Sequence, residues 1–242
     1  MDTQYTALAN SITALAASHP KPRYLVAVAG APGSGKTTLA TAVAAQINRL
    51  GLSPESDGKV KAAVLSMDGF HLPRSSLDAL PEEQRKEAYI RRGAPWTFDV
   101  KAFGAFMKSL RQWADSSPGE EEGVLTAPTF SHATKDPVPD GVTISNDISI
   151  VIVEGNYLLL DEAEWRDISG LVDYRVFVDV DLREARERLA RRHVEAGIEP
   201  SLDRGFARVD QNDYLNGVLV SEKRVRVDVV VRSEREPDDL RV

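Results

Sequence analysis

Residues 30–37 read Gly-Ala-Pro-Gly-Ser-Gly-Lys-Thr and match GxxxxGK[ST], the pattern of a phosphate-binding P-loop. The apolar run at 24–29 before the motif is predicted to be a buried strand. A helix is predicted from Thr37 to Leu50, because its apolar residues recur at helical spacing and Gly51 follows them. The motif therefore lies between a strand and a helix N-terminus, which is the setting that phosphate binding requires.

The glycines of this loop let backbone N–H groups converge on phosphate oxygens, and the helix N-terminus adds a partial positive charge. Lys36 is expected to reach the β- and γ-phosphates of a nucleotide, and the Thr37 hydroxyl to bind Mg²⁺. The alternative is a glycine-rich turn that binds nothing, and it is disfavoured because every position of the motif is filled. The residues expected to bind the nucleotide are Gly30, Ala31, Pro32, Gly33, Ser34, Gly35, Lys36, Thr37 and Thr38.

Composition narrows the class of protein. The 242 residues are 42% hydrophobic and 28% charged, as in ordinary globular proteins. The net charge of −7 argues against a nucleic acid or a membrane surface as the main partner. The chain has no cysteine, which excludes disulfides, thiolate zinc sites and a cysteine nucleophile. No apolar run approaches the roughly 20 residues of a membrane helix, and the N-terminus lacks signal-peptide features, so we expect a cytoplasmic protein.

Strands alternate with helices along the chain, which predicts a parallel sheet covered on both faces within a single domain, 1–242. Two short strands are expected between 124 and 145, a solvated turn at 116–123 and a loose end from 233. The strands of the sheet are expected at 24–29, 62–67, 148–153, 174–180 and 225–231. The helices are expected at 2–18, 37–50, 81–90 and 182–196, from Asp99 onward, and near 205–220.

Two acidic residues follow strands of this sheet, and the carboxyl ends of such strands are where ligands bind. Asp68 is a candidate general base for an acceptor hydroxyl, or a ligand of Mg²⁺ directly or through water. Glu154 is a candidate for the acidic group that organises Mg²⁺. The alternatives are an ordinary turn aspartate and a strand-end carboxylate with a structural role.

The helix at 182–196 is rich in arginine, and Arg188 and Arg192 share one flank of its apolar stripe. Two guanidinium groups there could clamp transferring phosphates, so we expect a lid at about 183–206. The alternative is a solvated helix whose arginines pair with its own glutamates. His193 falls on the apolar stripe and is expected to be packed. Together these elements predict an α/β fold of the three-layer P-loop NTPase type, with a mainly parallel central sheet and an arginine-bearing helical lid.

Aromatic residues and a histidine gather in the irregular middle of the chain and could line a small-molecule pocket. They are Trp96, Phe98, Phe130 and His132. We expect residues 69–145 to form an insert that binds the acceptor.

The ordered set of motifs resembles the group of phosphoribulokinases, uridine kinases and bacterial-type pantothenate kinases, and is most similar to its small nucleoside-kinase-like members. The resemblance covers about residues 22–232. It rests on the P-loop followed by Met-Asp-Gly-Phe at 67–70, Arg-Gly-Ala-Pro-Trp-Thr-Phe-Asp at 92–99, Ala-Pro-Thr-Phe-Ser-His at 127–132 and Val-Glu-Gly-Asn-Tyr-Leu-Leu at 153–159.

The resemblance implies a kinase that moves the γ-phosphate of ATP onto a hydroxyl of a small metabolite, with ATP and Mg²⁺ as cofactors. In this resemblance, Asp68 matches the acidic residue near the acceptor hydroxyl of the group. Glu154 matches the acidic residue of its Glu-Gly strand end, and Arg188 and Arg192 match its lid arginines. Phe130 and His132 match a Tyr-Ser-His-like acceptor segment in which Phe replaces Tyr. Asn216 resembles a late asparagine of the group. Residues 93–99 depart from the histidine-containing segment of uridine kinases.

Several questions stay open at this point. The acceptor is a nucleoside, a vitamin precursor, a sugar or a sugar phosphate, and a homodimer is one option for the assembly. The competing function is a nucleotide-dependent regulatory NTPase or switch, or a degenerate kinase that regulates a partner. The chain has no NKxD segment of the kind that guanine-specific switches use, which favours the kinase.

Overall fold

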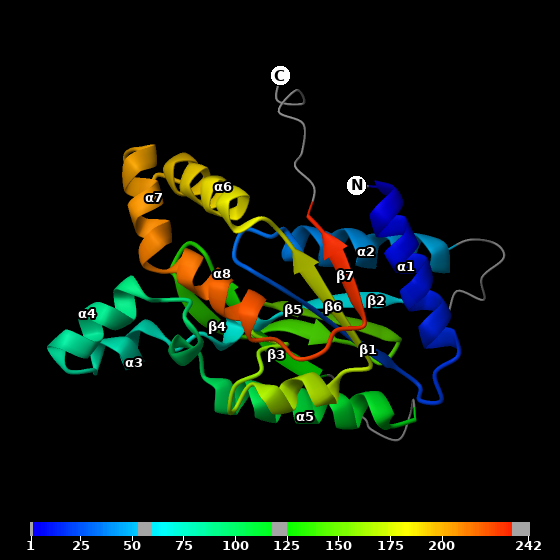
Figure 1. Cartoon of the computed structure of the whole chain (residues 1–242). Coiled ribbons are helices and arrows are strands. Elements are labelled where there is room, and N and C mark those ends of the chain that lie inside the picture. Colours follow the sequence, from blue (N-terminus) through cyan, green and yellow to red (C-terminus); the bar gives the residue numbers. More distant parts are fainter. Residues whose placement is uncertain (1, 53–59, 118–124, 234–242) are drawn as a thin grey trace.

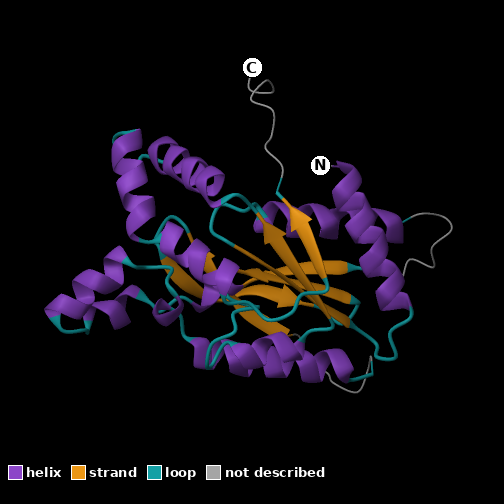
Figure 2. Cartoon of the chain, viewed as in Figure 1, coloured by secondary structure: helices purple, strands orange, loops and turns teal. Residues whose placement is uncertain are grey.

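Five parallel strands form the central sheet of the computed structural model, which describes residues 2–52, 60–117 and 125–233 (Figures 1 and 2). Their order across the sheet is β2-β5-β1-β6-β7, and every neighbouring pair is parallel. The strands are β1 (Tyr24–Gly30), β2 (Ala62–Ser66), β5 (Ile150–Gly155), β6 (Tyr174–Asp179) and β7 (Val229–Arg232). The predicted parallel sheet is confirmed.

The central strands β1 and β5 are buried along their whole length. Their valine, isoleucine and leucine side chains occupy both faces, as expected where helices cover a parallel sheet on each side. The register pairs Val28 with Glu154 and Ser66 with Glu154. Glu154 therefore lies between the carboxyl ends of β1 and β2, next to the start of the P-loop.

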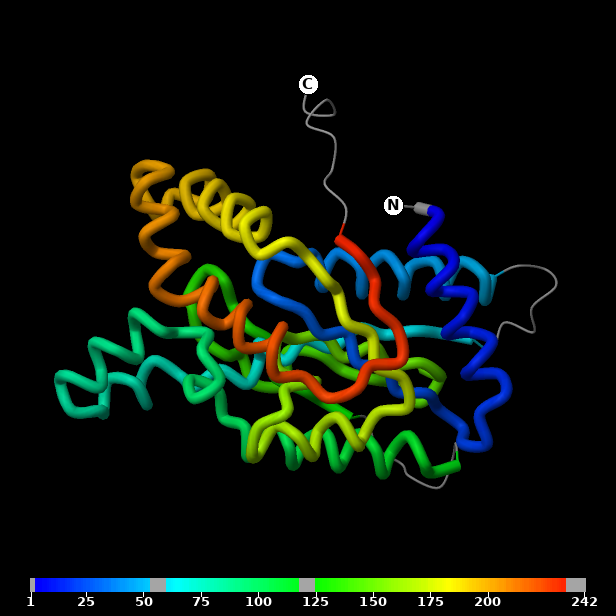
Figure 3. Tube along the Cα trace, in the orientation of Figure 1, coloured from blue at the N-terminus to red at the C-terminus, as the bar shows by residue number. Residues whose placement is uncertain are grey.

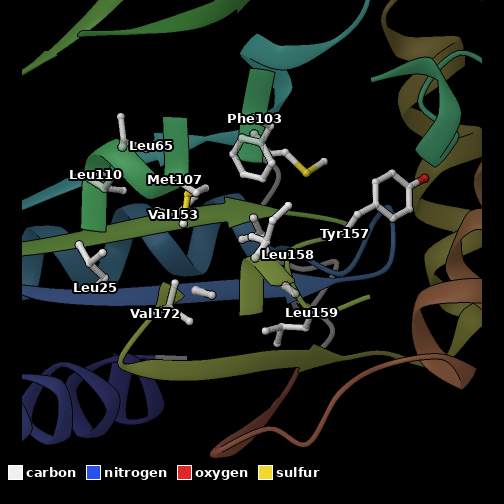
Figure 4. Close-up of a cluster of buried hydrophobic side chains, with 14 of the residues drawn as sticks. Leu25, Leu65, Phe103, Met107, Leu110, Val153, Tyr157, Leu158, Leu159 and Val172 are labelled. Carbon is white, nitrogen blue, oxygen red and sulfur yellow. The ribbon is translucent and has the colours of Figure 1, made fainter. Parts of the chain in front are cut away.

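Helices cover the two faces of the sheet and complete three layers. On one face, α1 (Asp2–Ala17) and α2 (Lys36–Gly51) pack Ile12, Leu39 and Val43 against the strands. On the other, α5 (Val100–Asp115) and α8 (Asp213–Glu222) cover the strands. Figure 4 shows α5 side chains, with Met107 and Leu110 among them, packed over β1 and β5. Within the described ranges, no helix combines the length and the apolar composition needed to cross a bilayer.

Two pairs of helices extend from the same end of the molecule, away from α1 (Figure 3). One pair is α3 (Arg74–Asp78) and α4 (Glu82–Ile90), and the other is α6 (Leu182–Glu195) and α7 (Leu202–Gln211). A separate antiparallel hairpin, β3 (Leu125–Ser131) and β4 (Asp136–Ile144), packs on the 3₁₀ turn η1 (Met67–Phe70) that follows β2. At that contact a Cβ on Gly69 would lie 2.0 Å from the Pro128 carbonyl oxygen, so the close approach requires glycine.

The structure differs from the sequence-based expectation in three places. Residues 73–95 contain two helices, α3 and α4, where one was expected at 81–90. The helix expected near 205–220 is two helices, which meet at Asn212, whose backbone leaves the helical region at φ −139° and ψ −72°. The last strand begins at Val229 and not at Val225, where the N–H donates to Leu159 O outside the sheet. Most of the expected turn at 116–123 and the end beyond 233 lie outside the described residues.

We expect the burial of apolar side chains in the central sheet to make the largest contribution to the free energy of unfolding. Val26 in β1 is fully buried, whereas Val230 in the edge strand β7 is 47% exposed. We expect Val26→Ala to lower the free energy of unfolding by about 2 kcal/mol, since it removes two buried methyl groups and leaves a cavity. The matched variant Val230→Ala should change it by less than about 0.5 kcal/mol. Urea unfolding followed by circular dichroism measures both, and equal losses would contradict this account of the core.

Candidate active site

The P-loop joins β1 to α2 with a backbone that favours glycine. Gly33 and Gly35 have φ values of +78° and +84°, in the left-handed region. No side chain caps the N-terminus of α2, so its first N–H groups remain available to an anion. The buried Ser34 hydroxyl has no hydrogen-bond partner among the described residues. An uncapped helix end with an orphaned hydroxyl beside it fits a bound phosphate group.

Glu154 is the buried carboxylate of the site. It is 3% exposed, and its Oε2 accepts a hydrogen bond of 3.1 Å from the Thr37 hydroxyl. Burial raises the pKa of Glu154, while the positive charge of Lys36 and the hydroxyl of Ser66 oppose that shift. Lys36, Thr37 and Glu154 thus come together as expected, and Thr38 lies exposed in the first turn of α2.

The oxygen donors at this point suit Mg²⁺, which is held in many phosphate sites by one or two carboxylates together with substrate phosphates. Thr37 and Glu154 supply a hydroxyl and a carboxylate side by side. Within the described parts of the chain, no three histidine, cysteine or acidic side chains gather in a metal-binding group. The residues present therefore fit a cation that phosphate oxygens and water help to hold.

Asp68 lies in η1, just beyond the end of β2. Its N–H donates to the Ser66 hydroxyl at 3.3 Å, which caps the turn. The side chain is half-buried, and its charge acts on Glu154, His71 and Tyr157, so it lies close to all three. In the described ranges its carboxylate forms no ion pair. A carboxylate without a cationic partner beside a phosphate cradle is able to accept a proton.

Aromatic rings form one side of this site. The His71 ring stacks on Phe98 with centroids 3.9 Å apart and on Phe130 at 4.8 Å, and Phe130 contacts His132 at 5.5 Å. Phe98, Phe130 and His132, which the sequence pointed to, are therefore brought together. We call the cluster of His71, Phe98, Phe130 and His132 the aromatic wall. Trp96 is not part of it.

His71 is the member of the aromatic wall that contacts Asp68. Sequence reasoning gave this histidine no role. Its Nδ1 lies 2.8 Å from the Asp68 carbonyl oxygen. Burial lowers the pKa of His71, although the Asp68 charge opposes the shift, which favours a neutral ring. The signal that could have identified it is its place three residues after Asp68 in the same turn.

The arginine-bearing helix α6 lies against the P-loop. Arg188 donates to the Gly33 carbonyl oxygen at 3.4 Å and to Glu184 at 2.6 Å. Leu189 packs against Gly33, where an added Cβ would lie 3.0 Å from the leucine. Arg191 likewise pairs with Glu187 of the same helix at 2.7 Å, so both arginines pair with glutamates of α6, and Arg188 in addition contacts the P-loop. His193 is buried and packed, as expected.

Asp213, at the start of α8, is a second residue that sequence reasoning missed. Burial raises the pKa of its carboxyl group, and the charges of Arg192, Arg208 and Lys36 oppose the rise. Asp213 is therefore within electrostatic range of Arg192, Arg208 and the P-loop lysine. No motif marks this position, because only the meeting of α6, α7 and α8 brings those charges together. Asn216 is buried, and its amide donates to the Asn212 side chain at 3.0 Å.

The raised pKa of Glu154 predicts a cost to stability. The folded state binds this proton more tightly than the unfolded chain does, so the ionised carboxylate lowers the free energy of unfolding as the pH rises above about 4.5. We expect Glu154→Gln to be more stable than the wild type at neutral pH, with an advantage that shrinks toward acid. Urea unfolding between acid and neutral pH measures this.

The control for that experiment is Glu222→Gln, because Glu222 is exposed at the end of α8. The free energy of unfolding of this variant should equal that of the wild type at every pH. A Glu154→Gln protein that is less stable than the wild type at neutral pH would show that the hydrogen bonds of Glu154 outweigh its burial.

Comparison with known proteins agrees with this geometry. The Phosphoribulokinase / Uridine kinase family matches residues 25–201. A Schizosaccharomyces pombe protein named as a candidate uridine kinase is 34% identical over 213 residues, which cover 88% of this chain and 84% of that protein. An ATP-dependent kinase-like protein of Aspergillus versicolor is 40% identical over 166 residues, 68% of this chain and 92% of that protein.

A solved structure shares the fold. The crystal structure of a candidate kinase of a fructose transport system from Silicibacter sp. TM1040 superposes with a TM-score of 0.77 at 29% identity, and covers 94% of this chain and 98% of that one. The family match spans well over half of the chain and includes the P-loop, Asp68 and Glu154. The chain is an ATP-dependent phosphotransferase with the P-loop kinase fold, and it belongs to the phosphoribulokinase and uridine kinase family.

Proposed function

We propose that this kinase transfers the γ-phosphate of ATP to a hydroxyl of a small metabolite, with Asp68 as the general base. The observation that carries the proposal is the meeting of three groups at one edge of the sheet. These are the uncapped end of α2, the Thr37–Glu154 contact and the carboxylate of Asp68. A site with a phosphate cradle and a carboxylate free of ion pairs in the described chain suits phosphoryl transfer to an oriented hydroxyl.

Each residue has a part in the proposed reaction. The P-loop N–H groups and Lys36 would hold the β- and γ-phosphates, and Thr37 and Glu154 would hold Mg²⁺, which would supply positive charge next to the phosphate oxygens. Asp68 accepts the proton of the acceptor hydroxyl as its oxygen bonds to the γ-phosphorus and the bond from that phosphorus to ADP breaks. Arg188 and Arg192 of the lid, 183–206, stabilise charge on the transferring group.

The acceptor is proposed to bind in the insert 69–145, against the aromatic wall. Stacked rings suit an acceptor with a flat or ring-shaped body, and the hydrogen-bonding edges of His71 and His132 can select its polar groups. Nucleosides, vitamin precursors and sugars all meet this requirement. The names of the relatives point to a nucleoside or to a sugar. The partners are then ATP and this metabolite, the proposed location is the cytoplasm, and a homodimer stays among the assemblies to test.

Asp68→Asn tests the base. We expect kcat for the best acceptor to fall by about 10²–10⁴, because the amide cannot accept the proton, while ATP binding stays within about twofold. The measurement is ADP release with Mg²⁺ across a panel of nucleosides, vitamin precursors and sugars, beside ATP binding by calorimetry. Asp167→Asn, at an exposed site far along the chain, is the control. A fully active Asp68→Asn enzyme would refute the assignment.

Arg188→Gln tests the lid. Arg188 contacts the P-loop, whereas Arg191 on the same helix pairs with Glu187 and is exposed. We expect Arg188→Gln to lower kcat by about 10–10³ with a smaller change in KM, and Arg191→Gln to lower it less than about threefold. Steady-state kinetics with the identified acceptor decide this. Equal effects of the two substitutions would mean that α6 is a structural helix only.

The same panel separates the kinase from a regulatory NTPase. Large ADP release with one acceptor, lost in Asp68→Asn, supports the kinase. Slow ATP hydrolysis that ignores every acceptor and the Asp68 substitution would favour the switch.

A further inference from the structure

A cavity lies beside the aromatic wall, between α8, the 3₁₀ turn η2 (Pro95–Thr97) and the loop after β5. Its volume of about 610 Å³ is in the range of small-molecule sites. Trp96, Phe98 and Trp165 line it on the aromatic side, and Leu215 and Leu219 of α8 line it on the aliphatic side. None of the residues proposed for phosphate or proton transfer is among its lining residues.

The cavity and the aromatic wall share one ring. Phe98 belongs to both sites, since it lines the cavity while its ring stacks on His71. Tyr157 is fully buried behind it, and contacts Phe98 at 5.7 Å and Trp165 at 5.2 Å. Trp96, by contrast, is 49% exposed. Trp96 and Phe98, both of which the sequence associated with a small-molecule pocket, line this cavity.

The charged side chains that line this cavity differ in whether an ion pair neutralises them. Arg91 donates to the side-chain oxygens of Asn212 and Asn216 at 3.3 and 3.5 Å, at the long end of the hydrogen-bond range. Both partners are neutral amides, and in the described ranges Arg91 forms no ion pair. Glu162, also in the lining, is already paired with Lys223 at 2.7 Å. The half-buried guanidinium of Arg91 is therefore a positive charge in the cavity that no carboxylate of the described residues neutralises.

We propose that this cavity is a second ligand site, for a small organic acid with a planar apolar body. The body lies against Trp96 and Leu215, where burial of apolar surface and stacking on the indole stabilise it. The acid group binds Arg91, whose planar guanidinium can form two charge-assisted hydrogen bonds in place of two long neutral ones. Glu164, exposed in the same lining, repels an anion and so fixes the direction of the ligand.

The probe for the test is 8-anilinonaphthalene-1-sulfonate, a planar aromatic anion, with the full-length protein. Two of the chain's three tryptophans line the cavity, so energy transfer from tryptophan to the dye reports binding there. Leu215 and Leu202 are 45% and 44% exposed on neighbouring helices, and only Leu215 lines the cavity. We expect Leu215→Glu to weaken dye binding by at least about tenfold, and Leu202→Glu to leave it unchanged. Equal binding by the two variants would overturn the proposed location.

A second arm tests recognition of charge. Arg91→Gln should weaken dye binding by at least about tenfold. Arg85→Gln, in the helix α4 that ends just before Arg91, should not, because Arg85 does not line the cavity. Benzoate should displace the dye from the wild type at lower concentration than benzamide, its neutral isostere. Equal displacement by the two, or an Arg91→Gln protein that binds as the wild type does, would overturn the preference for an acid.

The third arm separates this site from the kinase site. Dye binding should persist with saturating ATP and Mg²⁺ and in the variants Asp68→Asn and His132→Ala. Displacement by the nucleotide, or loss of binding in either variant, would place the dye in the kinase site and overturn the proposal. Because dye binding does not depend on phosphoryl transfer, failure of the proposed function would leave this result unaffected.

Discussion

A carboxylate buried at the end of a fully buried strand is the constraint around which this site is arranged. Removing the charge of Glu154 from water is costly unless partners compensate for it. Thr37, Ser66 and Lys36 do so only in part, because burial still raises the pKa of Glu154. The parallel register aligns Glu154 with Val28 of β1 and Ser66 of β2. The sheet thus places a carboxylate where Mg²⁺ and phosphate would need one, at a cost in stability that a site without function would not need.

Close contacts connect the helix α6 to the P-loop. An added Cβ on Gly33 would lie 3.0 Å from the Ala185 carbonyl oxygen of α6, and one on Gly205 of α7 would lie 2.8 Å from that of Ala190. A Cβ on Gly217 of α8 would lie 3.5 Å from the Ala31 Cβ. Glycine at these positions lets three helices approach one another and the loop. Arg188 and Arg192 of α6 are thereby brought near the P-loop and near Asp213 of α8, which is distant in the sequence.

The aromatic residues of the middle segment divide into two groups with different surroundings. His71 joins Phe98 and Phe130 beside Asp68, whereas Trp96 turns to the cavity under α8. Phe98 is the ring that they share. One short segment, η2 and its neighbours, therefore contributes to both the cavity and the aromatic wall.

The sequence by itself determined the parallel sheet, the P-loop and the positions of Asp68 and Glu154, because each depends on local pattern: apolar runs, a phosphate-binding motif and carboxylates at strand ends. The pairing of His71 with Phe98 and Phe130, the charges around Asp213, and the separation of Trp96 from the acceptor side depend on contacts between residues far apart in the chain. Local pattern also missed the break at Asn212, since the apolar spacing of α7 and α8 reads as continuous. Side-chain packing between elements that are distant in the sequence decided these features, and such packing leaves no signature at any single position.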